Sequence, residues 1–292
     1  MRQKKTEEGH MSIGTNIRKL RERMKDGTKL TQEQLAEKLG VTFQAVSAWE
    51  RDEYLPETAN ILKLMTALDA SADAILDGRK RDFETKKTIY DWEHMKTYVK
   101  TTAKNRGMRN TLEAIDFAVE AHNGQSRKNS PETPYIYHPL NMACHALAMG
   151  IRDDEIIAGI LLHDVIEDCR KADNSKFIPE DLPVNDKTRE IVRLMSHEKT
   201  TDENRDEVMK AYYKALAGNP EAALVKCIDR CNNLTTMSWG LSRDRIYRMI
   251  KETEQYYPDL LDVVKGTPEY NDAAFLLRYQ IESMLDIYKR LM

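Results

Sequence analysis

The residues best suited to chemistry in this chain are His163 and Asp164, which adjoin in a stretch that also contains Glu167 and Asp168. At about 100° per residue of an α-helix, we expect these four side chains to face the same way as the apolar residues of the stretch. Three carboxylates and an imidazole facing a core, with no Lys or Arg among them, are costly unless a positive charge lies between them. A metal ion is the simplest such charge. The pair alone does not establish it, because a lone helical His is commonly a surface residue or a satisfied core residue.

Two other places supply residues of the same chemical types. His138 directly precedes Pro139, so we expect an extended backbone at His138 and a helix that begins with the proline. Asp229, Asn233 and Thr236 lie at i, i+4 and i+7 of a predicted helix and form one polar line along it. The apolar and cysteine neighbours of Asp229 favour partial burial of this line over solvent exposure.

Helices must position these residues, because apolar side chains repeat with helical spacing through most of the chain. Residues 152–169 are predicted to form one helix, whose acidic start at residues 153–155 suits a helix N-terminus. A second helix is predicted from Thr111, followed by a loop rich in Asn, Gly, Ser and Pro at residues 122–139. Asn219-Pro220 marks the start of another. We therefore predict an all-α fold.

The composition excludes few classes of protein. The 292 residues carry a net charge of −3 and are 41% apolar, as in a soluble globular protein. The longest apolar run, residues 156–162, is far shorter than the roughly 20 residues that cross a bilayer, so we expect no membrane partner and a cytoplasmic location. The four cysteines lack CxxC spacing, so we expect reduced thiols. The small net charge means that nucleic acid would have to bind a local surface.

Residues 13–78 have the apolar spacing of a compact bundle of about five short helices. Thr31 and Thr42 suit helix N-caps, and Gly40 between them suits a turn with positive φ. The segment LTQEQLAEKLGVTFQAVSAWE at residues 30–50 resembles the helix-turn-helix of the Cro/C1-type (XRE) repressor family. A DNA-binding domain of this type is the implied function.

This resemblance implies that the second helix lies in the major groove of DNA. Gln44 and Ser47 would face outward, with Gln44 binding an adenine edge and Thr42 binding a phosphate. Phe43 and Ala48 stand where the family often carries basic or polar residues. A fold retained for dimerisation or protein docking therefore stays open as the alternative.

His138, the pair His163-Asp164 and Asp229 follow one another in the order H…HD…D, which resembles the pattern of the HD phosphohydrolase superfamily. The resemblance implies that these four residues hold one divalent metal ion. Two imidazoles and two carboxylates suit manganese, iron or zinc, with positions left for water and a phosphate oxygen.

Three segments narrow the match to the hydrolase domain of RelA/SpoT proteins and to small, hydrolase-only alarmone hydrolases, over residues 110–240. They are RKNSPETPYIYHP, LLHDVIED and VKCIDRCNNLTTM. The resemblance implies manganese-dependent removal of the 3′-diphosphate of the guanosine alarmones (p)ppGpp. It gives Glu167 and Asp168 the task of activating the attacking water or assisting the leaving group. It also implies binding of phosphates and nucleoside by four residues: Arg127, Lys128, Asn233 and Thr236.

The sequence departs from the family at Asn232, where His is usual, and at Thr235, where Arg is frequent. These differences bear on the shape of the substrate, since the four expected metal ligands and the acidic pair are intact. We expect no synthetase domain, and hence degradation without synthesis. The expected organisation is a flexible leader (1–12), the helix-turn-helix domain (13–78), a helical linker (79–109) and the HD domain with C-terminal helices (110–292).

Other functions remain open at this point. An antitoxin-type hydrolase of this family would act on pyrophosphorylated nucleotides or tRNA 3′ ends, and its helix-turn-helix would regulate its own operon. A repressor would instead sense a nucleotide in the HD pocket, although Glu167 favours turnover. We expect a homodimer, because repressors of this type pair and the C-terminal amphipathic segment offers a surface.

Overall fold

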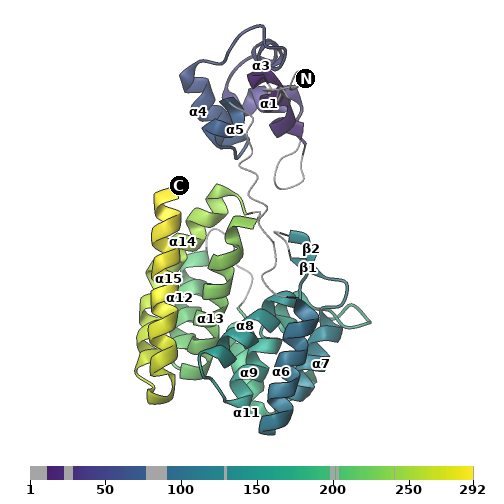
Figure 1. Ribbon diagram of the computed structural model, residues 1–292, viewed down its shortest axis with the longest axis vertical. Coiled ribbons are helices and arrows are strands. Elements are labelled where there is room, and N and C mark those ends of the chain that lie inside the picture. The colour runs from purple at the N-terminus through teal and green to yellow at the C-terminus, as the bar shows by residue number, and fades with distance from the viewer. Residues whose placement is uncertain are drawn as a thin grey trace, which may run out of the picture. The chain divides into compact units, whose positions relative to one another are not determined.

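The computed structural model describes most of the chain, in these ranges: 12–22, 29–76, 91–127, 130–197, 201, 204–239 and 241–291. Contacts divide it into two compact units near residue 85. Nearly all regular structure in the described ranges is helical, which confirms the predicted fold class (Figure 1). The predicted leader lies outside the described residues except for Ser12, as do residues 79–90 of the predicted linker.

The first unit is a bundle of short helices, as its apolar spacing predicts. The helices are α1 (Ile13–Glu22), α2 (Gln32–Leu39), α3 (Phe43–Glu50), α4 (Thr58–Ala67) and α5 (Ala72–Leu76). Each contributes one fully buried side chain to a common core made by Ile17, Leu35, Val46, Leu64 and Ile75. Burial of these side chains, and not helix propensity alone, stabilises elements of 5 to 10 residues.

The predicted caps of the helix-turn-helix are present. Thr31 accepts a hydrogen bond from the backbone N–H of Gln34, whose side chain accepts from Thr31 in return. Gly40 ends α2 with φ of 67°, a conformation that is strained for other residues. Thr42 caps α3 by accepting from the N–H of Ala45 at 3.2 Å.

The three residues predicted to contact DNA differ in exposure. Thr42 and Gln44 are exposed at the start of α3. Ser47 is only 9% exposed, and its hydroxyl accepts a hydrogen bond from the Arg51 guanidinium at 2.5 Å. The outward orientation predicted for Ser47 is therefore wrong, because Arg51 lies over it one turn further along the chain.

The second unit is larger and also helical. Its helices are α6 (Trp92–Arg106), α7 (Arg109–Ala121), α8 (Tyr137–Ala148), α9 (Asp154–Leu162), α10 (Val165–Asp168), α11 (Asp186–Met195), α12 (Arg205–Ala217), α13 (Pro220–Thr236), α14 (Arg243–Lys265) and α15 (Asn271–Leu291), with 3₁₀ turns at Pro179–Asp181, Met237–Trp239 and Pro268–Tyr270. Figure 1 shows α12 to α15 as one group of helices, beside a second group of α6 to α9 and α11. In the described ranges, no helix combines the length and apolar character that a membrane span requires.

Helix α9 is the centre of the second unit and packs against α7, α8, α11 and α13. Its residues from Ile156 to Leu162 are all buried. Asp153 caps it through the N–H of Ile156 at 3.1 Å, as its acidic start predicts. Gly159 lets α11 approach closely, because a Cβ there would lie 2.8 Å from Cγ2 of Ile191.

The helix predicted over residues 152–169 is interrupted. Helix α9 ends at Leu162, His163 and Asp164 form a turn, and α10 follows. The His163 ring explains the break, because its Nδ1 donates to the carbonyl of Ile160 at 2.8 Å. In a continuous helix that carbonyl would accept from the N–H of Asp164. The single-helix prediction is therefore wrong at the two residues that matter most.

Two further predictions are corrected around His138. The predicted loop contains an antiparallel pair of short strands, β1 (Ser126–Arg127) and β2 (Ser130–Pro134). Helix α8 begins at Tyr137, so His138 lies in its first turn and not in an extended segment. Pro139 is tolerated there because the first N–H groups of a helix have no partner within it. Helix α6, predicted as part of a connecting helix, packs on α7 and α8.

Candidate metal centre

The four residues of the H…HD…D pattern converge from α8, the turn before α10, and α13. The Nε2 atom of His138 lies 3.8 Å from Oδ2 of Asp164 and 3.3 Å from Oδ1 of Asp229. The Nε2 atom of His163 lies 2.9 Å and 3.9 Å from the same two oxygens. Both imidazoles are almost fully buried. Residues 91 positions apart in the sequence thus present ligand-type atoms to one point.

Hydrogen bonds set the direction of both rings. The Nδ1 atom of His138 donates to Oδ1 of Asn232 at 2.6 Å, as Nδ1 of His163 does to the Ile160 carbonyl. This leaves each Nε2 atom facing the carboxylates. Nε2 of His163 is buried and, although it lies 2.9 Å from Oδ2 of Asp164, it makes no well-directed hydrogen bond in the described residues. A divalent cation fits this donor set and would satisfy that atom.

The charge states also suit a cation. Burial, and then the charge of Arg127, lower the pKa of His138, so its imidazole is neutral at pH 7. Burial alone would lower the pKa of His163, but the Asp164 carboxylate outweighs it and raises that pKa to about 9. Burial alone would raise the pKa of Asp229, but the Lys226 ammonium, 3.1 Å away, holds it well below its usual range. Burial alone would also raise the pKa of Asp164, but the His163 charge outweighs it and holds that pKa well below its usual range. A cation therefore meets two ionised carboxylates and replaces a proton on His163.

Tyr135 connects the expected ligands with the acidic pair. Its hydroxyl lies 2.6 Å from Oδ2 of Asp164 and 3.1 Å from Oδ2 of Asp168. The Tyr135 ring stacks on the His122 ring with centroids 4.6 Å apart, and the Arg127 guanidinium lies 5.6 Å from the centroid of the Tyr135 ring. Tyr135 is therefore held in position to orient both carboxylates.

The two residues of the acidic pair differ in exposure. Asp168 is exposed and Glu167 is half-buried. Oε1 of Glu167 accepts a hydrogen bond from the backbone N–H of His197 at 2.8 Å. The inward orientation predicted for Asp168 is wrong because α10 starts anew after the turn, which changes the direction of its side chains.

Three of the four predicted substrate residues come together beside Asp229. Arg127 donates to Oδ1 of Asn233 at 3.1 Å and lies 3.4 Å from the hydroxyl of Thr236. Asn233 in turn donates to Oδ1 of Asp229 at 2.6 Å. The fourth, Lys128, lies outside the described residues.

Sequence reasoning missed three residues of this centre: Tyr135, Lys226 and Asn232. Tyr135 stands three positions before His138, in the turn that leads into α8, and Lys226 stands three positions before Asp229, one turn earlier in α13. Asn232 was noted only as a departure from the family pattern, yet it holds the His138 ring. Spacing of this kind was the available signal for all three.

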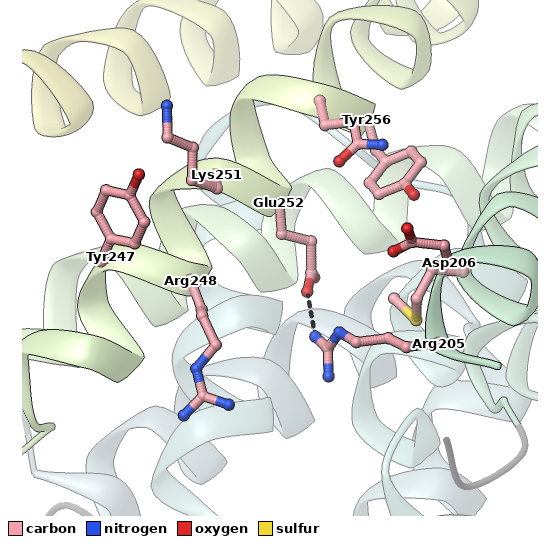
Figure 2. A pocket seen from close by; sticks show the side chains of 9 residues that line it. Arg205, Asp206, Tyr247, Arg248, Lys251, Glu252 and Tyr256 are labelled. Carbon is pink, nitrogen blue, oxygen red and sulfur yellow. Dashed lines mark hydrogen bonds and ion pairs between the residues drawn. The ribbon is translucent and has the colours of Figure 1, made fainter. Parts of the chain in front are cut away.

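A groove of about 200 Å³ lies on the side of α12 and α14 (Figure 2). Figure 2 shows Arg205 on α12 reaching Glu252 on α14, an ion pair of 3.2 Å. Glu252 also pairs with Arg230, the neighbour of Asp229 on α13. The Glu252 carboxylate of α14 thus pairs with one cation from α12 and one from α13. We therefore interpret these ion pairs beside the groove as contacts that hold the three helices together.

Comparison with known proteins agrees with this geometry. Residues 114–260, which contain the four converging residues, match a family model described as an HD domain. A protein of Xenopus tropicalis named guanosine-3′,5′-bis(diphosphate) 3′-pyrophosphohydrolase MESH1 is 32% identical over 160 residues, which cover 53% of this chain and 83% of that protein. The chain belongs to this family of HD-domain pyrophosphohydrolases. The resemblance found in the sequence is confirmed.

Further comparisons concern the first unit and other relatives. Residues 17–75 match a family model described as helix-turn-helix. A guanosine-3′,5′-bis(diphosphate) 3′-pyrophosphohydrolase of Aquifex aeolicus is 30% identical over 175 residues, 58% of this chain and 24% of that protein. A solved structure titled "A metazoan ortholog of SpoT hydrolyzes ppGpp and plays a role in starvation responses" covers 61% of this chain and 95% of its own, at 21% identity and a TM-score of 0.47. It is too distant to bear on the assignment.

Proposed function

We propose that the second unit is a guanosine-3′,5′-bis(diphosphate) 3′-pyrophosphohydrolase, which removes the 3′-diphosphate of ppGpp as pyrophosphate. The observation that carries the proposal is the convergence of His138, His163, Asp164 and Asp229 within the matched HD domain. In the reaction, a water oxygen bonds to the phosphorus attached to the 3′ oxygen. The bond between that phosphorus and the 3′ oxygen breaks, and the 3′ oxygen takes up a proton.

The four converging residues would hold one divalent ion, for which we propose manganese. When bound, the ion would polarise a phosphoryl oxygen and make water a stronger nucleophile near neutral pH. The role of the protein is to fix the ring directions through Asn232 and the Ile160 carbonyl, and the carboxylates through Tyr135 and Lys226. Mixed nitrogen and oxygen ligands suit manganese better than calcium or magnesium.

The surrounding residues have complementary roles in the proposal. Arg127, with Lys128 next to it, would bind phosphate oxygens, for which a planar guanidinium can offer two hydrogen bonds. Asn233 and Thr236 would contact the nucleoside, since both lie beside Arg127. Glu167 and Asp168 would take the proton of the attacking water or supply one to the leaving oxygen. The link between Asp168 and Asp164 through Tyr135 supports this role for Asp168.

The first unit would bind DNA. The exposed Thr42 and Gln44 at the start of α3, within the helix-turn-helix match, support this proposal.

For the whole protein we propose a cytoplasmic homodimer. The four free cysteines agree with a reducing location, and exposed apolar side chains on α15, such as Phe275 and Tyr279, offer a surface for pairing.

Product analysis tests the proposed reaction. Purified full-length protein is incubated with ppGpp and manganese, and the products are separated by ion exchange. We expect guanosine 5′-diphosphate and pyrophosphate in equal amounts, loss of reaction with a chelator, and no cleavage of guanosine 5′-diphosphate itself. Release of orthophosphate, or cleavage of a pyrophosphorylated tRNA 3′ end with no reaction of ppGpp, would refute the proposal.

A further inference from the structure

A cavity of about 640 Å³ lies in the second unit, and none of the residues to which the reaction has been assigned lines it. Helix α6 contributes Met95 and Tyr98 to its wall, α8 contributes Asn141 and His145, and α15 contributes Gln280. Sites for small molecules in proteins are typically about 300 to 1,000 Å³, with mostly apolar walls and a few converging polar groups. This cavity has both properties.

The charge of the cavity does not favour a nucleotide. None of the described residues that line it is Lys or Arg, so the side chains that usually bind phosphates are absent from this wall. Its carboxylate, Asp91, is already engaged as the cap of α6, where it accepts from the N–H groups of Glu93 and His94. Burial lowers the pKa of His145, so this imidazole is neutral at pH 7. An uncharged ligand matches such a wall better than an ionic one.

Two amides in the wall connect the cavity with the metal centre. Oδ1 of Asn141 accepts a hydrogen bond from Nδ2 of Asn232 at 3.1 Å, and Asn232 accepts from Nδ1 of His138 at 2.6 Å. Oε1 of Gln280 accepts from Sγ of Cys231 at 3.4 Å. The wall therefore touches two consecutive residues of α13, the helix that also carries Asp229. A change at Asn141 reaches an expected metal ligand through two hydrogen bonds.

We propose that this cavity is an effector site for an uncharged, largely apolar small molecule that carries an N–H or O–H donor. The donor competes with Asn232 for Oδ1 of Asn141, which loosens the orientation of His138 and weakens cation binding. Residues that orient a metal ligand commonly change metal affinity when they are disturbed. The effect on catalysis rests on the proposed function, whereas binding in the cavity does not.

The binding test uses N-phenyl-1-naphthylamine, an uncharged aromatic probe with one N–H group, whose fluorescence rises in apolar surroundings. Ala148 lies in the cavity wall on its exposed side, and a helical side chain covers the turn that precedes it. Ala148→Phe therefore fills the space beside His145. We expect saturable binding by the full-length wild type and at least tenfold weaker binding by Ala148→Phe. Ala215→Phe, the same change at an exposed alanine of α12, should bind like the wild type.

The coupling test is the manganese dissociation constant, measured by calorimetry with and without saturating probe. We expect the probe to weaken manganese binding about fivefold or more in the wild type and in Ala215→Phe. In Ala148→Phe the manganese dissociation constant should not change. Equal probe binding by all three proteins would overturn the site, and selective binding with an unchanged manganese constant would overturn the coupling. Neither measurement needs turnover, so a failure to release pyrophosphate would count against the proposed function alone.

Discussion

Asn232 accepts a hydrogen bond from Nδ1 of His138 and donates one to Asn141, so it holds the His138 ring from behind. The family resemblance leads one to expect His at this position. Either side chain can accept from an imidazole N–H, because a neutral His keeps one acceptor nitrogen and Asn has a carbonyl oxygen. The departure therefore preserves the orientation of the ring, although it changes the shape of the wall behind it.

Asn232→Leu keeps the approximate volume of the side chain but removes the acceptor. We expect manganese affinity to fall by about 10- to 100-fold, because Nδ1–H of His138 loses the partner that fixes its tautomer. Calorimetric titration measures the change, and Asn105→Leu, at an exposed position of α6, is the matched control. Unchanged affinity in a folded Asn232→Leu protein would show that the contact does not orient the ligand.

At the scale of the elements, Glu252 joins three helices of the second unit. It pairs with Arg205 of α12 and Arg230 of α13, and accepts from the hydroxyl of Tyr213 at 2.9 Å. Burial alone would raise the pKa of Glu252, but the Arg230 charge outweighs it and holds that pKa below its usual value. A carboxyl group with a lowered pKa in the folded state stabilises the protein above its unfolded pKa, and this stabilisation is lost as the pH falls through the folded value.

Glu252→Gln removes the charge and leaves Arg230 buried without its carboxylate. We expect the free energy of unfolding at pH 7 to fall by about 2 kcal/mol, a value discounted for the partial exposure of the pair. The difference from the wild type should shrink as the pH drops below about 4, near the unfolded pKa of Glu. Urea unfolding at several pH values measures this. A pH-independent difference, or one shared by the surface variant Glu282→Gln, would contradict the role given to Glu252.

Local signals explain which elements the sequence predicts correctly. The caps at Thr31, Asp153 and Asn219 involve neighbours within three residues, so they are visible in the chain itself. The break at His163 depends on where its ring points, and periodicity does not contain that information. The same holds for the link from Asn141 to Asn232, which joins positions 91 residues apart. The candidate ligands were nevertheless predictable, because their types and order match a known pattern.

At the scale of the whole molecule, the chain combines two segments that match known domain families, a helix-turn-helix and an HD domain. We expect Gln44→Ala to lose about 1–3 kcal/mol of discrimination at one base pair of the preferred DNA site, because a bidentate contact to adenine is lost. The site is first selected from random-sequence DNA, and fluorescence anisotropy then compares binding to it and to single-base variants. Glu37→Ala, on the exposed side of α2, should change nothing. Equal weakening on every sequence would assign Gln44 to the DNA backbone instead.

The central claim is that the four converging residues support hydrolysis of a guanosine alarmone. Its most direct test is the initial rate of pyrophosphate release from ppGpp with manganese, for the wild type, Asp164→Asn and the surface control Asp116→Asn. We predict rapid release by the wild type and the control, and a loss of about a thousandfold or more in Asp164→Asn, since a metal-assisted step contributes several kcal/mol. Release at the same rate by Asp164→Asn, or no release by the wild type, would contradict the account.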